Sequence, residues 1–223
     1  MLTQAIGGLL PSAIAVALSP FPIVAVVIVL GTPRARANGP AFALGWVAGL
    51  TAVTTVIVLL TSGAGDSTGT ATAVDLLKLA LGVLLLVLAA KKWKGRPRHG
   101  EGPATPGWMA TLDSVEPARA MLLGATLSAN PKNLALTAAA AASIAEAQLG
   151  GRDTAVAATA FVLLGSVTVV GAVAFRLIAG DRSERPLAAV KQFMLHNNDV
   201  IVMVILLVFG AKLIGDGLGG LGT

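Results

Sequence analysis

Long apolar stretches separated by short polar segments dominate the pattern of hydrophobic and polar positions. The first stretch covers residues 1–30 and contains no charged side chain. Five more follow, at residues 40–60, 74–90, 121–145, 154–178 and 200–214. Because a helix of about 20 mostly apolar residues crosses the hydrocarbon core of a bilayer, this pattern predicts an all-α integral membrane protein with six transmembrane helices.

Composition strengthens the prediction of a membrane protein. Of the 223 residues, 55% are hydrophobic and 12% are charged, whereas soluble domains contain about 25% charged residues. The chain has no cysteine, which excludes disulfides, thiolate catalysis and Cys-bound metal centres. Its two histidines, His99 and His196, do not form a metal-binding pattern. We therefore expect a single membrane domain, residues 1–223, with no metal or other cofactor.

The basic residues predict the orientation of the chain. The net charge is +5, and most lysines and arginines flank apolar stretches, which indicates contact with anionic lipids rather than with nucleic acid. Twelve lie beside the connections between spans one and two, three and four, and five and six: Arg34, Arg36, Lys91, Lys92, Lys94, Arg96, Arg98, Arg119, Arg176, Arg182, Arg185 and Lys191. The positive-inside rule places these connections in the cytoplasm. The prediction is a multi-pass plasma (inner) membrane protein with both termini outside.

Two pairs of segments match each other along the chain. Residues 18–22 (LSPFP) and 127–131 (LSANP) share the pattern LSxxP, and residues 83–91 (VLLLVLAAK) resemble residues 204–212 (VILLVFGAK). These matches predict two three-helix halves, repeat 1 at about residues 1–94 and repeat 2 at about residues 119–223, joined by a Gly- and Pro-rich cytoplasmic linker at about residues 95–118. Because three spans per half is an odd number, the halves enter the membrane in opposite directions, as inverted repeats do.

Proline interrupts the first and fourth predicted spans near their centres. A proline inside a helix removes a backbone donor and leaves a carbonyl without its partner, so in a membrane the break must be covered by protein or line a polar cavity. Both breaks lie about ten residues, or roughly 15 Å, from a membrane face, which is near the midplane. The predicted substrate-binding residues surround the breaks: Ser19, Pro20, Pro22, Ser128, Asn130, Pro131, Lys132 and Asn133.

Lys132 is the ionisable residue that this pattern places deep in the membrane. A charge at that depth costs at least about 2.5 kcal/mol, which makes the residue a candidate for function. With Asn133 and the amides of a helix that begins after Pro131, it would bind an anionic group such as phosphate, sulfate or carboxylate. The alternative is that Lys132 fills the break by bonding to freed carbonyl groups.

No carboxylate or histidine is predicted near the midplane. Sites for bare divalent cations need several oxygen ligands, and an intramembrane transferase needs an acid–base pair. Export of bare divalent cations and intramembrane transferase activity are therefore both disfavoured, and we predict that the protein is not an enzyme.

Small residues predict close contacts between helices. Gly45, Gly49, Gly165 and Gly171 have alanine neighbours, a composition that lets membrane helices approach closely and is compatible with a homodimer.

Several segments together carry a family resemblance. The loop GTPRARANG, the glycine-containing FALGWVAGL, the segment SANPKNLALTAAAAASIA and the terminal GAKLIGDGLGGL resemble the LysE superfamily, and more specifically its GAP or Sap proteins, the glycopeptidolipid- and sulfolipid-addressing proteins. The resemblance implies a six-span inner-membrane protein that moves envelope lipids or their precursors, often beside lipid-synthesis and lipid-export proteins. It also places the family motif on Asn130, Pro131, Lys132 and Asn133.

The sequence thus favours a transporter that moves an anionic envelope lipid or lipid precursor by alternating access at a midplane site. Two alternatives stay open. One is a LysE-like exporter of small solutes such as amino acids, and the other is an accessory or scaffold protein of a lipid synthesis and export complex.

Overall fold

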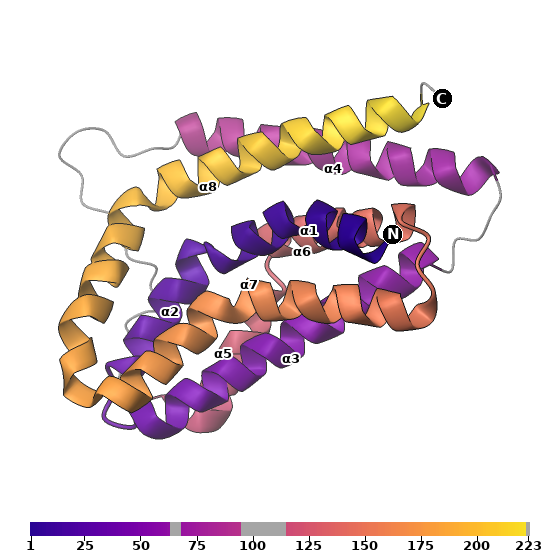
Figure 1. The fold of residues 1–223 in the computed structure, drawn as a ribbon. Coiled ribbons are helices and arrows are strands. Elements are labelled where there is room, and N and C mark those ends of the chain that lie inside the picture. The colour runs from indigo at the N-terminus through magenta and orange to yellow at the C-terminus, as the bar shows by residue number, and fades with distance from the viewer. Residues whose placement is uncertain (63–67, 95–114, 222–223) are drawn as a thin grey trace.

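The computed structural model describes residues 1–62, 68–94 and 115–221, and the elements in these ranges are all helical (Figure 1). They are α1 (Leu2–Ala17), α2 (Pro20–Leu30), α3 (Ala35–Ser62), α4 (Thr68–Lys94), α5 (Pro117–Ser128), α6 (Pro131–Glu146), α7 (Gly151–Ala179), the 3-10 helix η2 (Gly180–Ser183) and α8 (Glu184–Leu221). Residues 95–114, which include most of the predicted linker with Arg96 and Arg98, lie outside the described residues.

The predicted apolar stretches are helical, but fewer helices meet the length and hydropathy of a membrane span than predicted. Among the described residues, the helical stretches Ala35–Thr61 and Gly151–Gly220 are long and apolar enough to cross a membrane. The pair Leu2–Ala17 and Pro20–Leu30, bent by 49°, meets the same standard when it is taken as one broken span. The structure therefore supports two or three spans by this standard, and the count of six stays a prediction.

Both predicted breaks are present, and in each the new helix begins with a proline. α1 ends at Ala17 and α2 begins at Pro20, with Ser19 in the N-cap position, where its side chain makes no capping hydrogen bond. α5 ends at Ser128 and α6 begins at Pro131, with Asn130 in the capping position. A proline at the first helical position has the right φ and lacks only an N–H that would have no partner there. When the two halves are aligned by their helix starts, Ser19 corresponds to Asn130. The LSxxP match instead pairs Ser19 with Ser128, so the two alignments differ by two residues.

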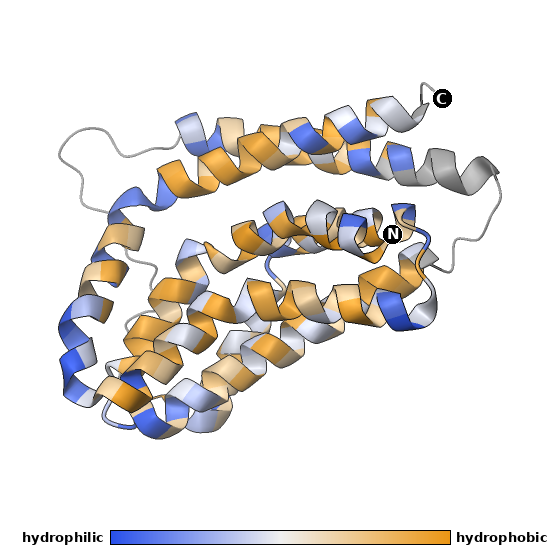
Figure 2. Cartoon of the chain, in the orientation of Figure 1, coloured by the Kyte–Doolittle hydropathy of each residue, from blue (hydrophilic) through white to orange (hydrophobic). Residues whose placement is uncertain are grey.

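Helices that are distant in the sequence pack side by side. α4 lies along α8, α3 lies along α5, and α1 contacts both α6 and α7 (Figure 1). Trp46, Phe42 and Phe161 are the largest fully buried side chains and belong to the core. Many large apolar side chains are exposed on the helices, and hydrophilic residues gather near helix ends and connections (Figure 2). This distribution suits helices that contact lipid.

Glycines allow α3 and α5 to touch along their backbones. A Cβ atom on Gly45 would overlap the Met121 carbonyl, and one on Gly124 would lie 2.8 Å from the Trp46 amide nitrogen. Gly49 and Gly165 also face close neighbours on other helices. The prediction of close packing is wrong for Gly171, because a Cβ atom there would meet nothing within 4 Å.

Candidate functional site

The two helix breaks meet at a polar contact between side chains from opposite halves of the chain. The Lys132 ammonium donates to the Ser19 hydroxyl oxygen over 2.5 Å, and the Ser19 hydroxyl donates to Asn133 Oδ1 over 3.1 Å. Ser19 is 1% exposed and Asn133 is fully buried. The contact between the α1–α2 break and the start of α6 thus brings together three of the predicted site residues, which we call the break cluster: Ser19, Lys132 and Asn133.

Side chains from other helices complete the end of α1. A helix ends with four carbonyl groups that have no partner inside it. In α1, the Ala15 carbonyl accepts a hydrogen bond of 3.3 Å from the Lys132 ammonium, and the Ala17 carbonyl accepts one of 2.6 Å from the Thr168 hydroxyl on α7. The other two accept backbone N–H groups from the break itself. The last four carbonyl groups of α1 are therefore all paired within the protein, which suits a break in a membrane interior.

The second break is completed mainly by its own residues. The Asn130 side chain accepts a hydrogen bond of 2.9 Å from the Asn133 amide and donates one of 2.7 Å to the Leu127 carbonyl. The Asn133 side chain also donates to Leu127, and the Ser128 hydroxyl donates to the Ala125 carbonyl over 2.7 Å. Asn130 and Ser128 thus support the break and do not contact Lys132 by any of these bonds. The Asn133 backbone amide is thereby already paired with the Asn130 side chain.

The predicted prolines position the cluster and make no polar contact in it. Pro20 and Pro22 are buried in the first turn of α2, where each removes an N–H that would otherwise need a partner. Pro131 starts α6 directly before Lys132, and it is exposed. The prolines therefore fix where the new helices begin, and so where Ser19 and Lys132 can meet.

Lys132 has no carboxylate partner among the described residues. Three other lysines do form ion pairs: Lys78 pairs with Asp75 and Glu146, Lys92 with Asp199, and Lys212 with Asp216. Within the described ranges, the Lys132 ammonium donates hydrogen bonds to one hydroxyl and one carbonyl, which use two of its three N–H donors. A partly buried positive charge with neutral neighbours and one donor to spare is suited to bind an anion.

Sequence reasoning missed two hydroxyl groups close to the cluster. Thr168 lies 151 residues away from the carbonyl that it caps, so no local pattern links them. Thr137 lies one turn after Asn133 on α6, is fully buried, and its hydroxyl has no hydrogen-bond partner. Residues four apart share one helix face, so Thr137 extends the polar face of α6 beyond the cluster.

A separate polar pocket of about 340 Å³ lies where the α2–α3 connection meets the end of α7. Arg36, Arg176 and Glu184 are among its lining residues. Arg176 donates to the Gly180 carbonyl over 2.7 Å and pairs with Glu184. No group of three or more His, Asp or Glu side chains able to hold a metal ion is found in the part of the chain that the structure describes.

These features define an all-helical protein with helices apolar enough to span a membrane and two broken helices joined through a lysine. A family model described as Sap, sulfolipid-1-addressing protein, matches residues 9–219, and the chain belongs to this family. The predicted Sap resemblance is confirmed, whereas membership of the wider LysE superfamily stays a prediction. Neither the curated proteins nor the solved structures gave a match. The family description gives the protein a role connected with sulfolipid addressing.

Proposed function

We propose that the protein moves an anionic envelope lipid or lipid precursor across the plasma membrane by exposing the break cluster alternately to its two sides. The observation that carries this proposal is the contact of Lys132 with Ser19, which places between two broken helices a cation that has no carboxylate partner among the described residues. A headgroup that carries phosphate, sulfate or carboxylate would supply the missing negative charge.

The pairing of the helices supports an inverted repeat of two halves. Each half has a broken helix pair followed by two long helices, α1–α4 in the first and α5–α8 in the second. α1 packs on α7 as α5 packs on α3, and α2 packs on α8 as α6 packs on α4. α3 contacts α7, and α4 contacts α8. A two-fold relation between the halves would produce this set of contacts, and rocking of such halves is a common basis of alternating access.

The break cluster is placed to respond to such a movement. The hydrogen bond that Lys132 donates to Ser19 and the one that Ser19 donates to Asn133 both cross from one half to the other. An anionic headgroup that took the Lys132 ammonium away from Ser19 would weaken the link between the halves. Binding would thereby favour a different arrangement of the two breaks, since a ligand shifts an equilibrium by its differential affinity for the two states.

One observation favours the accessory alternative. The Lys132 ammonium donates to the Ala15 carbonyl, so it also completes the end of α1. In an accessory or scaffold protein of a lipid-synthesis complex, this capping would be the whole role of the lysine.

Lipid mass spectrometry on gently purified protein tests the two roles against each other. We compare wild type, Lys132→Gln and the control Lys212→Ala, each matched for folded yield. A glutamine amide can still donate to Ala15 and Ser19 but carries no charge. Enrichment of one anionic lipid class in wild type and Lys212→Ala, with its loss in Lys132→Gln, supports the headgroup site. The same lipid profile in all three proteins contradicts the headgroup site and leaves the accessory role.

A further inference from the structure

The end of α6, like its start, is joined to the first half of the chain. The Lys78 ammonium of α4 lies 2.6 Å from Oε1 of Glu146, the last residue of α6, and 2.8 Å from Asp75 Oδ1 of its own helix. The side chains of Lys78 and Asp75 are 8% and 9% exposed, whereas that of Glu146 is 54% exposed. The ion pair of Lys78 with Glu146 thus joins a buried cation of the first half to a carboxylate of the second half that can reach water.

Glu146 lies on the same face of α6 as Lys132. The spacing from Lys132 to Glu146 through the residues between them is that of a single helix face, and those residues are all small and buried: Ala135, Ala139 and Ala142. Lys132 contacts the break between α1 and α2, and Glu146 contacts α4. This face of α6 is therefore held against the first half at both ends, which lie about 20 Å apart along the helix at 1.5 Å per residue.

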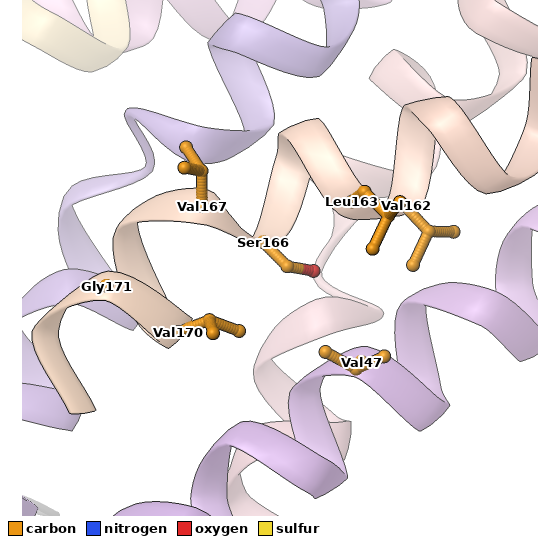
Figure 3. Close-up of a pocket in the computed structure, with 7 residues that line it drawn as sticks. All are labelled: Val47, Val162, Leu163, Ser166, Val167, Val170 and Gly171. Carbon is orange, nitrogen blue, oxygen red and sulfur yellow. The ribbon is translucent and has the colours of Figure 1, made fainter. Parts of the chain in front are cut away.

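Open space between the halves lies toward the opposite end of the molecule. α7 begins shortly after Glu146 and ends at Ala179, near the polar pocket of about 340 Å³ that residues of both halves line. An apolar groove of about 290 Å³ between α3 and α7 reaches from the middle of α7 toward the same end (Figure 3). The ion pair of Lys92 with Asp199 joins α4 to α8 and does not involve α6. The halves are thus closed on α6 at the Lys78 end and leave space at the other, as in a transporter that is shut toward one side of the membrane.

We propose that the ion pair of Lys78 with Glu146 is a gate, and that its release opens the face of α6 between Lys132 and Glu146 as the path of an anionic headgroup to or from the break cluster. The headgroup's use of this path rests on the proposed function, whereas the gate itself does not. Glu146 suits the role because its exposed carboxylate can exchange the lysine for water at little cost. Asp75 suits it because it remains beside Lys78, so the buried ammonium keeps one carboxylate partner when the gate opens.

Thiol labelling of the full chain tests the gate, since the chain has no cysteine of its own. Two reporters lie on the proposed path: Ala142→Cys, one turn before Glu146, and Ala135→Cys, one turn after Lys132. A third reporter, Ala25→Cys, replaces a fully buried residue of α2 and detects a general loosening of the fold. The rate at which each single thiol reacts with a water-soluble maleimide measures how often its surroundings open to water.

Each reporter is placed in the wild-type chain and in three variants. Glu146→Gln removes the charge from the gate and leaves Asp75 beside Lys78, so the buried lysine keeps a partner. Glu146→Asp keeps the charge on a side chain that is one methylene shorter. Asp216→Asn is the matched control, because it removes a carboxylate from the pair with Lys212 within one helix and breaks no link between the halves. Circular dichroism and size-exclusion profiles check that each variant is folded.

Glu146→Gln should raise the labelling rates of both path reporters about fivefold, the factor that corresponds to one net hydrogen bond. Glu146→Asp should raise them by less, and Asp216→Asn should leave them unchanged. The Ala25→Cys reporter should react slowly throughout. Unchanged rates at Ala135→Cys and Ala142→Cys in Glu146→Gln overturn the gate. A rise at Ala142→Cys alone, which means that only the end of α6 frays, also overturns it, as does an equal rise at Ala25→Cys.

The labelling needs no lipid, so it separates the gate from the proposed function. Faster labelling of both path reporters in Glu146→Gln, together with no anionic lipid enrichment in wild type, would count against the proposed function and leave the gate intact. Anionic enrichment that is lost in Lys132→Gln, together with unchanged labelling of the path reporters, would support the proposed function and overturn the gate.

Discussion

The Lys132 ammonium lies 2.5 Å from the Ser19 hydroxyl, although 113 residues separate the two along the chain. Each belongs to a break where one helix ends and another begins at a proline. The contact joins the two breaks directly, so a substitution at either residue should alter the packing of both breaks.

Removing the Ser19 hydroxyl should destabilise the protein. In Ser19→Ala, the Lys132 ammonium and Asn133 Oδ1 each lose a partner in a buried site, and an unsatisfied buried polar group costs about 1–3 kcal/mol. Thermal unfolding in detergent should show a lower midpoint than in wild type. Thr159→Ala, which removes an exposed hydroxyl bonded to its own helix, should change the midpoint little. Equal midpoints for Ser19→Ala and Thr159→Ala would show that the contact adds no stability.

Loss of the Lys132 charge should stop lipid movement while the fold is kept. In proteoliposomes with fluorescent phosphatidylglycerol, dithionite reports how fast labelled lipid reaches the outer leaflet. We expect wild type to accelerate this movement and Lys132→Gln to be at least about tenfold slower, the factor that corresponds to 1.4 kcal/mol. Lys212→Ala, which removes a lysine paired with Asp216, should move lipid like wild type. A Lys132→Gln rate equal to wild type would exclude the lysine as the headgroup ligand.

A methyl group at the crossing of α3 and α5 should disrupt the packing of these helices. The Cβ atom of Gly124→Ala would lie 2.8 Å from the Trp46 amide nitrogen, and backbone atoms there cannot rotate away. Overpacking of this kind costs about 1–3 kcal/mol or more. Gly7→Ala is the control, because a Cβ atom at that position meets nothing within 4 Å, and alanine there should be neutral or stabilising. Size-exclusion profiles and thermal midpoints should separate the two variants, and similar behaviour would argue against the close crossing.

The cap of α6 should tolerate serine better than alanine. Asn130→Ala removes the acceptor for the Asn133 amide, and loss of such a cap costs about 1 kcal/mol. Asn130→Ser keeps a capping oxygen, so its thermal midpoint should lie between those of Asn130→Ala and wild type. Identical midpoints for the serine and alanine variants would show that the amide bond of Asn133 does not stabilise this helix start.

The sequence by itself determined the local structure of this protein. Runs of apolar residues predict helices because their backbone groups must be paired inside a membrane. Proline predicts the breaks because it has no N–H to donate, and the helices do restart at Pro20 and Pro131. Lys132 stood out as a candidate because a charge among apolar residues is costly wherever the helix packs. These inferences need only neighbouring residues.

The tertiary structure decided which side chains meet. The LSxxP pattern aligned Ser19 with Ser128, whereas the helix starts align Ser19 with Asn130. Thr168 as a partner of the first break, and the open side of α7 at Gly171, had no signal in the sequence. Such contacts depend on how each helix is rotated and shifted against its neighbours. Close approaches such as Gly124 to α3 fix that rotation over long sequence distances, and apolar helices with many small residues look alike on every face until they are packed.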